Sequence, residues 1–183
     1  MKPFDRLLQQ WRIAKARRYV PHDSRVLDIG CGNGRLLAQL QPFIREGIGI
    51  DPDAPHTVER SSCRLIPGRF PDDLPDVGRF DAITMLAVFE HVPPVDIPRW
   101  TRACAELLQP HGLVILTVPS PAVDQIIPVL IRLGMIENIH FEQHHEFDAH
   151  STPALFARDG FEQVCARTFQ LGLNHLFVLR KCA

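Results

Sequence analysis

An apolar segment followed at once by three alternating glycines constrains the fold of this chain more than any other feature. Residues 24–29 (SRVLDI) predict a short buried strand. Gly30, Gly32 and Gly34 then predict a sharp turn, before a helix over 35–40. Glycine lets the backbone turn tightly and approach a ligand closely, and the start of the helix offers unpaired N–H groups. This strand, turn and helix predict a ligand site at the carboxyl end of a strand in an α/β protein.

The rest of the chain alternates strands and helices in the same way. The pattern predicts helices at 97–108 and 154–158, the second beginning with Thr152 as N-cap and Pro153 as first helical residue. Alternation of this kind is typical of a mostly parallel sheet with helices on both faces. The last two predicted strands are joined by a turn so short that they must pair antiparallel. The further strands are predicted at 47–50, 63–66, 80–85, 113–118, 161–169 and 174–180.

The second predicted strand ends in an acidic residue that could bind a nucleoside. Asp51 ends the second predicted strand, 21 residues after Gly30, and could accept hydrogen bonds from a ribose diol or merely form a turn before Pro52. In a nicotinamide or flavin dinucleotide fingerprint the last glycine would stand at position 35, which is Arg35 here. From the residues alone, a dinucleotide, another nucleoside ligand and a turn without a ligand all remain open.

Several motifs together resemble class I S-adenosylmethionine-dependent methyltransferases, over about residues 20–181. Residues 26–34 (VLDIGCGNG) resemble their first motif, and residues 49–51 (GID) resemble their second. Glu90-His91-Val92 is similar to the sequence after strand four of ubiquinone-biosynthesis O-methyltransferases. Residues 80–83 (FDAI) resemble the family's fourth strand, and residues 107–112 (LLQPHG) resemble its turn before strand five. Residues 144–147 (HHEF) and 159–161 (DGF) resemble the type 11 and type 23 subgroups.

The resemblance implies a Rossmann-like α/β fold with a seven-strand, mostly parallel sheet, helices on both faces and a C-terminal antiparallel hairpin. We expect one domain over 1–183, with an N-terminal helix in 1–20 and an acceptor-covering insertion at 119–151. The implied activity is in-line methyl transfer from S-adenosylmethionine to oxygen or nitrogen of a small-molecule acceptor, leaving S-adenosylhomocysteine. Two alternatives are a non-catalytic binding or partner subunit of this fold and a different chemistry on the same cofactor.

The resemblance also assigns cofactor-binding residues. Asp28 would position the methionine ammonium, or else hydrogen-bond within its loop, and Leu86 would lie beside the methionine. The acid that usually contacts adenine is absent, because Arg69 stands in that region; Phe70 could cover the adenine ring instead, or backbone could read its edge. The glycine loop would wrap the cofactor and Asp51 would bind the ribose hydroxyls. The full set is Asp28, Gly30, Cys31, Gly32, Asn33, Gly34, Asp51, Pro52, Arg69, Phe70 and Leu86.

On the acceptor side the resemblance points to His144 as a general base, because it matches a family histidine and imidazole titrates near neutrality. His91 would orient the cofactor loop. Relatives that bind a metal carry an acid three residues before the Glu-His pair, where this chain has Ala87, so we expect no metal. The histidine-rich segment could also be a metal site through His140 and His144, or simply a solvated segment. The apolar residues of 126–135 could line an acceptor pocket or pack a helix.

Composition and net charge limit the classes of partner and the location expected for this protein. The chain has 183 residues and a net charge of −1, which argues against a general nucleic-acid or membrane-surface binder. It has no apolar stretch long enough to span a bilayer. Five cysteines without a CxxC motif indicate free thiols and a cytoplasmic location, although the arginines near the N-terminus could hint at an organelle address.

The N-terminal segment has a helical period of its own. Phe4, Leu7, Trp11 and Ala14 recur at the spacing of one helix face. We therefore expect a helix that docks this face on the domain.

Overall fold

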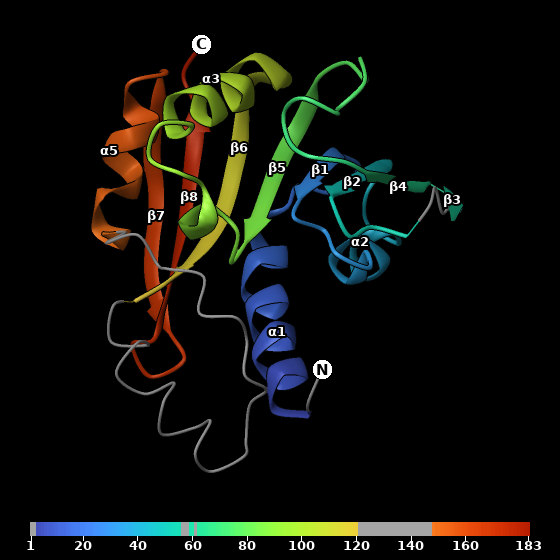
Figure 1. Cartoon of the computed structure of the whole chain (residues 1–183), viewed down its shortest axis with the longest axis horizontal. Coiled ribbons are helices and arrows are strands. Elements are labelled where there is room, and N and C mark those ends of the chain that lie inside the picture. The colour runs from blue at the N-terminus through green and yellow to red at the C-terminus, as the bar shows by residue number, and fades with distance from the viewer. Residues whose placement is uncertain (1–2, 56–58, 61, 121–147) are drawn as a thin grey trace.

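One twisted sheet runs through the whole molecule. The structure, a computed structural model, describes residues 3–55, 59–60, 62–120 and 148–183. In these ranges the strand order is β3-β4-β2-β1-β5-β6-β8-β7 (Figure 1). Strand β3 has only two residues, so the seven longer strands are those that the sequence predicts. The bounds are β1 (Arg25–Ile29), β2 (Glu46–Asp51), β3 (Glu59–Arg60), β4 (Cys63–Pro67), β5 (Phe80–Leu86), β6 (Leu108–Pro119), β7 (Phe161–Phe169) and β8 (Asn174–Lys181).

Strands β4, β2, β1, β5 and β6 pair in parallel, and β8 pairs antiparallel with both β6 and β7. The mostly parallel sheet and the C-terminal antiparallel hairpin are therefore confirmed. Five parallel strands all end at one edge of the sheet, and β7 ends there too because it is antiparallel to β8. We call this edge the carboxyl edge.

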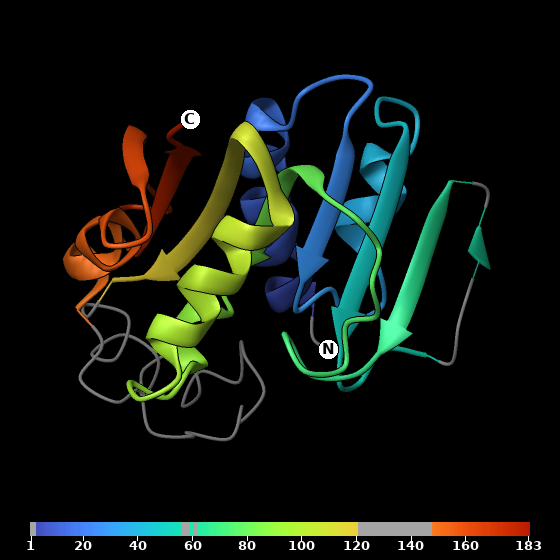
Figure 2. The ribbon, with the colours of Figure 1, turned by 90° about the horizontal axis from the view of Figure 1, so that it is seen from above.

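Helices cover both faces of the sheet (Figure 2). Two lie on one face, α1 (Pro3–Ala16) and α2 (Arg35–Leu40), and two on the other, α3 (Ile97–Leu107) and α5 (Thr152–Ala157). None of these described helices has the length and apolar composition needed to cross a membrane. Short 3-10 turns complete the set, namely η1 (Arg17–Tyr19), η2 (Phe89–His91) and η3 (Ala149–Ser151).

The alternation of side chains along each strand divides the core in two. In β5, Ile83 and Met85 pack on the α3 side with Phe89, whereas Ala82 packs on the α1 side with Ile13. Successive strand residues point to opposite faces, so both faces can be apolar only when both are covered by helices.

Two local expectations are wrong. Helix α1 does not dock through Leu7 and Trp11, whose exposed fractions are 59% and 42%. It docks through Ile13 and Ala16, because the small Ala16 lets the helix lie close to the sheet. The N-cap of α5 is not Thr152: the helix already includes that residue, and the residue before it takes the capping position without a side-chain hydrogen bond.

Candidate functional site

Most of the cofactor-binding residues predicted from the sequence lie on segments that meet at the carboxyl edge. The turn after β1, the end of β2, the loop after β4 and the segment after β5 all leave the sheet there (Figure 1). In an open α/β sheet this edge is where ligands bind.

The glycine loop takes a backbone that side chains rarely allow. Gly30, Gly32 and Gly34 have φ of 72°, 51° and 76°. A Cβ on Gly30 would lie 2.2 Å from Cγ2 of Val88, so this glycine is needed for packing against the segment after β5. A Cβ on Gly32 would meet no atom within 4 Å. The middle of the loop is therefore open, as a cradle that holds a ligand must be.

Asp51 is fixed by two backbone groups. Its Oδ2 accepts a 2.8 Å hydrogen bond from the Gly32 N–H, and its Oδ1 accepts one of 2.8 Å from the Asp53 N–H. A carboxylate has about four acceptor positions, so each oxygen keeps one for a further donor. This geometry fits a diol that donates to both oxygens.

Two residues of the glycine loop and one residue that follows β2 differ in exposure. Pro52 and the side chain of Asn33 are exposed. Cys31 is buried beneath the loop, where its thiol would meet a Cβ on Gly49 at 2.6 Å. Burial raises the pKa of this thiol, as do the charges of Asp28 and Asp51, so the group stays protonated and packs as a small apolar side chain.

Asp28 is a buried acid in β1, 4% exposed. Its Oδ1 accepts a 2.7 Å hydrogen bond from the hydroxyl of Thr84 in β5. Burial raises the pKa of Asp28 to about 7; the charge of Asp51 also raises it, whereas the Thr84 hydrogen bond lowers it. A buried carboxylate of this kind gains from a cation placed beside it, and an ammonium group would be such a cation.

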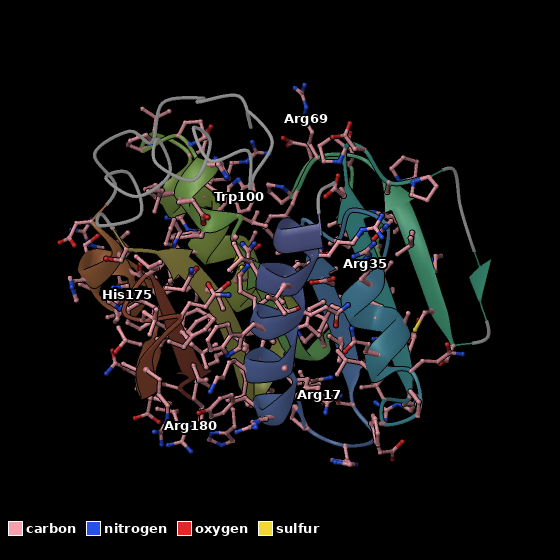
Figure 3. The ribbon with its side chains drawn as sticks, turned by 90° about the horizontal axis from the view of Figure 1, so that it is seen from below. Arg17, Arg35, Arg69, Trp100, His175 and Arg180 are labelled. Carbon is pink, nitrogen blue, oxygen red and sulfur yellow. The ribbon has the colours of Figure 1, made fainter. Side chains whose placement is uncertain are left out.

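The residues after β4 divide between solvent and core. The side chain of Arg69 is exposed and points outward from the molecule (Figure 3), while its backbone N–H donates to Oδ2 of Asp73. Phe70 is buried, and its ring packs edge-on to Trp100 of α3 with centroids 5.0 Å apart. A role of Phe70 over adenine stays a prediction. Leu86, half-buried, ends β5 on the α1 side.

The segment after β5 contains an acid that the sequence analysis weighed only as a metal ligand. Glu90 is 4% exposed, and its Oε2 has no hydrogen-bond partner among the described residues. Burial raises its pKa to about 7, against smaller lowering effects of its own backbone N–H and of Arg12 in α1. An acid directly after the apolar residues 87–89 (AVF) was the available signal. His91, next to it, is exposed.

Further along the carboxyl edge, two histidines are in contact. His175 of β8 pairs with Val118 at the end of β6, and its ring lies 4.8 Å from that of His150, in η3. Burial lowers the pKa of His175, as does His150, while Asp148 raises it. His140 and His144 lie outside the described residues. Within the described ranges no three His, Cys, Asp or Glu side chains are placed to hold a metal.

The sequence matches known proteins over most of its length. A family model described as a methyltransferase domain matches residues 4–166. The chain is 29% identical over 138 residues to a ubiquinone biosynthesis O-methyltransferase of Azorhizobium caulinodans, which covers 71% of this chain and 54% of that protein. It is 34% identical over 110 residues to the protein of that name in Xanthomonas axonopodis pv. citri, covering 55% and 45%. The chain thus spans about half the length of these curated relatives.

Solved structures share the fold. A 1,6-didemethyltoxoflavin-N1-methyltransferase of Burkholderia thailandensis, with its acceptor and S-adenosylhomocysteine bound, superposes with a TM-score of 0.68 at 18% identity, covering 95% of this chain and 78% of that one. The N-methyltransferase NodS of Bradyrhizobium japonicum, in complex with S-adenosylhomocysteine, gives 0.66 at 15% identity, covering 98% and 88%.

Proposed function

The chain belongs to the methyltransferase family whose domain model it matches, and we propose that it methylates a hydroxyl group of a small molecule. The observation that carries this proposal is the open glycine loop with Asp51 fixed beside it. Gly32 leaves space above the loop, and Asp51 keeps an acceptor position on each oxygen.

The residues of the loop fit S-adenosylmethionine. When bound, this cofactor supplies an electrophilic methyl group on a sulfonium. Asp51 would accept hydrogen bonds from the ribose hydroxyls, and Asp28 would face the methionine ammonium. The protein then needs mainly to align the acceptor with the methyl group and to exclude water.

A hydroxyl acceptor is supported by two observations. The curated relatives are named as O-methyltransferases. Glu90 is buried at the carboxyl edge with one unpartnered oxygen, and a carboxyl with a pKa of about 7 suits a base that takes a proton near neutral pH. We propose Glu90 as a second candidate for this role, in addition to His144, which the family resemblance favours. His91 keeps its proposed role in orienting the cofactor loop.

Calorimetry with S-adenosylhomocysteine tests the cofactor site. We expect Asp51→Ala to lower the affinity by about tenfold or more per lost hydrogen bond, since hydrogen bonds to charged groups contribute about 1.5–3 kcal/mol. The control is Asp53→Ala, which removes a nearby exposed carboxylate and leaves the Asp53 N–H in place. Equal affinity of parent and Asp51→Ala would show that the site is elsewhere.

The transfer itself is tested with labelled S-adenosylmethionine and matched phenol and aniline acceptors. We expect label in the phenols. A protein that binds the cofactor and labels neither class would be the non-catalytic alternative, and label in the anilines alone would make it an N-methyltransferase.

A further inference from the structure

The outward side of helix α1 carries an apolar stripe that nothing described covers. With 100° between successive helical residues, Leu7 and Trp11 lie within 40° of one another and opposite the docked residues Ile13 and Ala16. Their exposed fractions are 59% and 42%. A tryptophan and a leucine one turn apart on a helix surface are neighbours, so their exposed apolar area is continuous.

Cations lie on both sides of this stripe. Residues 3–19 contain five basic residues and one acidic residue, although the whole chain has a net charge of −1. At 100° per residue, Lys15 lies 40° from Trp11 on one side of the stripe, and Arg6 lies 100° from Leu7 on the other side, towards the line of Ile13. Arg17 and Arg18 lie in the 3-10 turn η1 that follows the helix. The arginines at 6, 17 and 18 are exposed. The near-neutral net charge of the whole chain therefore conceals a local excess of basic residues in and after α1, of which Arg17 is labelled at the far end of the helix in Figure 3.

A third exposed apolar residue lies on the neighbouring turn. The side chain of Gln170 donates a 3.0 Å hydrogen bond to the backbone oxygen of Leu8, which ties the β7–β8 turn to α1. The next residue, Leu171, is 97% exposed and has φ of 58°. A leucine in the left-handed region is strained, and strain of this kind is common at functional positions. Because Leu171 is almost fully exposed, its side chain does not contribute to the core of the protein.

The position of this surface relates it to the candidate site. Gln9 of α1 accepts a 3.0 Å hydrogen bond from Arg35, the first residue of α2 after the glycine loop, and the β7–β8 turn also lies at the carboxyl edge. Leu7 and Leu171 therefore lie at the end of the sheet that holds the candidate site.

We propose that this surface, formed by Leu7, Trp11, Leu171 and the flanking cations, docks on a lipid surface that carries anionic headgroups. Apolar side chains between cations are the pattern by which a helix binds in the plane of a membrane interface. A second copy of the chain fits less well, because a two-fold contact would bring the same cations of both copies together. The proposal does not depend on the reaction proposed above.

Co-sedimentation of the full chain with vesicles tests this. We expect binding to phosphatidylcholine vesicles that contain phosphatidylglycerol, little binding to phosphatidylcholine alone, and weaker binding as salt is raised. Arg18→Gln should lower the partition constant about fivefold. Trp11→Ser and Leu171→Asn should lower it further, each without loss of thermal stability.

The matched control is Val95→Ser, which removes an apolar residue 85% exposed just before α3, the helix on the other face of the sheet. We expect it to bind vesicles like the parent. Equal binding to both kinds of vesicle, or an unchanged partition of Trp11→Ser, would overturn the proposal. So would a dimer in light scattering that Trp11→Ser abolishes, since a second copy would then cover this surface.

Discussion

The two halves of the carboxyl edge are built by different means. Around the glycine loop, backbone geometry sets the site: three glycines with positive φ, and Asp51 fixed by two N–H groups. In the part of the edge that we propose for the acceptor, side chains from distant elements come together, among them Glu90 near Arg12 of α1 and His150 against His175. We refer to these halves as the cofactor half and the acceptor half.

The difference shows what each half demands of a sequence. A backbone that must pass at positive φ permits few residues, so the cofactor half requires particular residues at fixed spacing. A buried acid or a pair of imidazoles can come from any element that reaches the place. The acceptor half can therefore change its chemistry while the cofactor half stays the same.

The largest expected effect is in the acceptor half. If Glu90 is the base, Glu90→Gln should lower kcat by about 10²–10⁴-fold and leave the affinity for S-adenosylhomocysteine nearly unchanged. In the parent, turnover should rise with pH through about 7, as Glu90 loses its proton. Single-turnover methyl transfer over a pH series measures both.

Glu106→Gln is the control for this prediction, because it neutralises an exposed carboxylate of α3. If Glu90→Gln turned over as fast as Glu106→Gln, the base would be another group, and His144→Gln would be the next variant to measure. A parallel loss of turnover and of folded protein would assign Glu90 to stability instead.

The cofactor half is tested by comparing two glycines. Gly30→Ala places a Cβ 2.2 Å from Val88 and also strains φ, whereas Gly32→Ala only strains φ. We expect Gly32→Ala to lower the free energy of unfolding by about 1–2 kcal/mol and Gly30→Ala by about 2–4 kcal/mol. Urea denaturation measures both, and Val88→Ala should restore part of the Gly30→Ala loss. Equal losses in the two variants would mean that Val88 does not limit the loop.

The raised pKa of Asp28 predicts that the affinity for the cofactor depends on pH. A bound ammonium favours the charged carboxylate, so binding should release a proton when the pH is below about 7. The affinity for S-adenosylhomocysteine should then fall by up to tenfold per pH unit on acidification, while Asp28→Asn binds weakly and with less pH dependence. Calorimetry in buffers of different ionisation enthalpy counts the protons, and no release at pH 6 would contradict the prediction.

The same shift has a consequence for stability. Because the folded pKa of Asp28 lies above 3.8, the folded state holds the proton more tightly, and stability is lost as the pH rises from about 4 to about 7. Asp28→Asn keeps an oxygen for the Thr84 hydroxyl and avoids the buried charge. It should therefore melt at a higher temperature than the parent at pH 8 and not at pH 4.

The glycine loop, the place of Asp51 at the end of a strand, and the antiparallel C-terminal pair were predictable, because each rests on a local pattern that few backbones accommodate. The docking side of α1 was not. The period of Leu7 and Trp11 marks a helix, but it does not say whether the marked face points inward; the short stripe of Ile13 and Ala16, not the larger side chains, meets the sheet. The burial of Glu90, close enough to Arg12 of α1 for that charge to lower its pKa, is a tertiary feature and is equally hidden from the sequence.

The smallest expected effect concerns the histidine pair of the acceptor half. Burial lowers the pKa of His175, so the unfolded chain binds a proton there more readily than the folded one. The contribution of His175 to stability is therefore full above its unfolded pKa of about 6.5 and is lost as the pH falls through that value towards the lower folded pKa. His175→Gln should reduce the difference between the melting temperatures at pH 8 and pH 5.5.

His150→Gln should have the same sign, because the His150 charge also lowers the pKa of His175. The control is His22→Gln: this exposed histidine packs only edge-on to Phe43 with ring centroids 5.6 Å apart, and it should leave the difference unchanged. If His22→Gln and His175→Gln behaved alike, the pair would carry no linked proton. Glu90 would then be the group on which the pH dependence of the acceptor half rests.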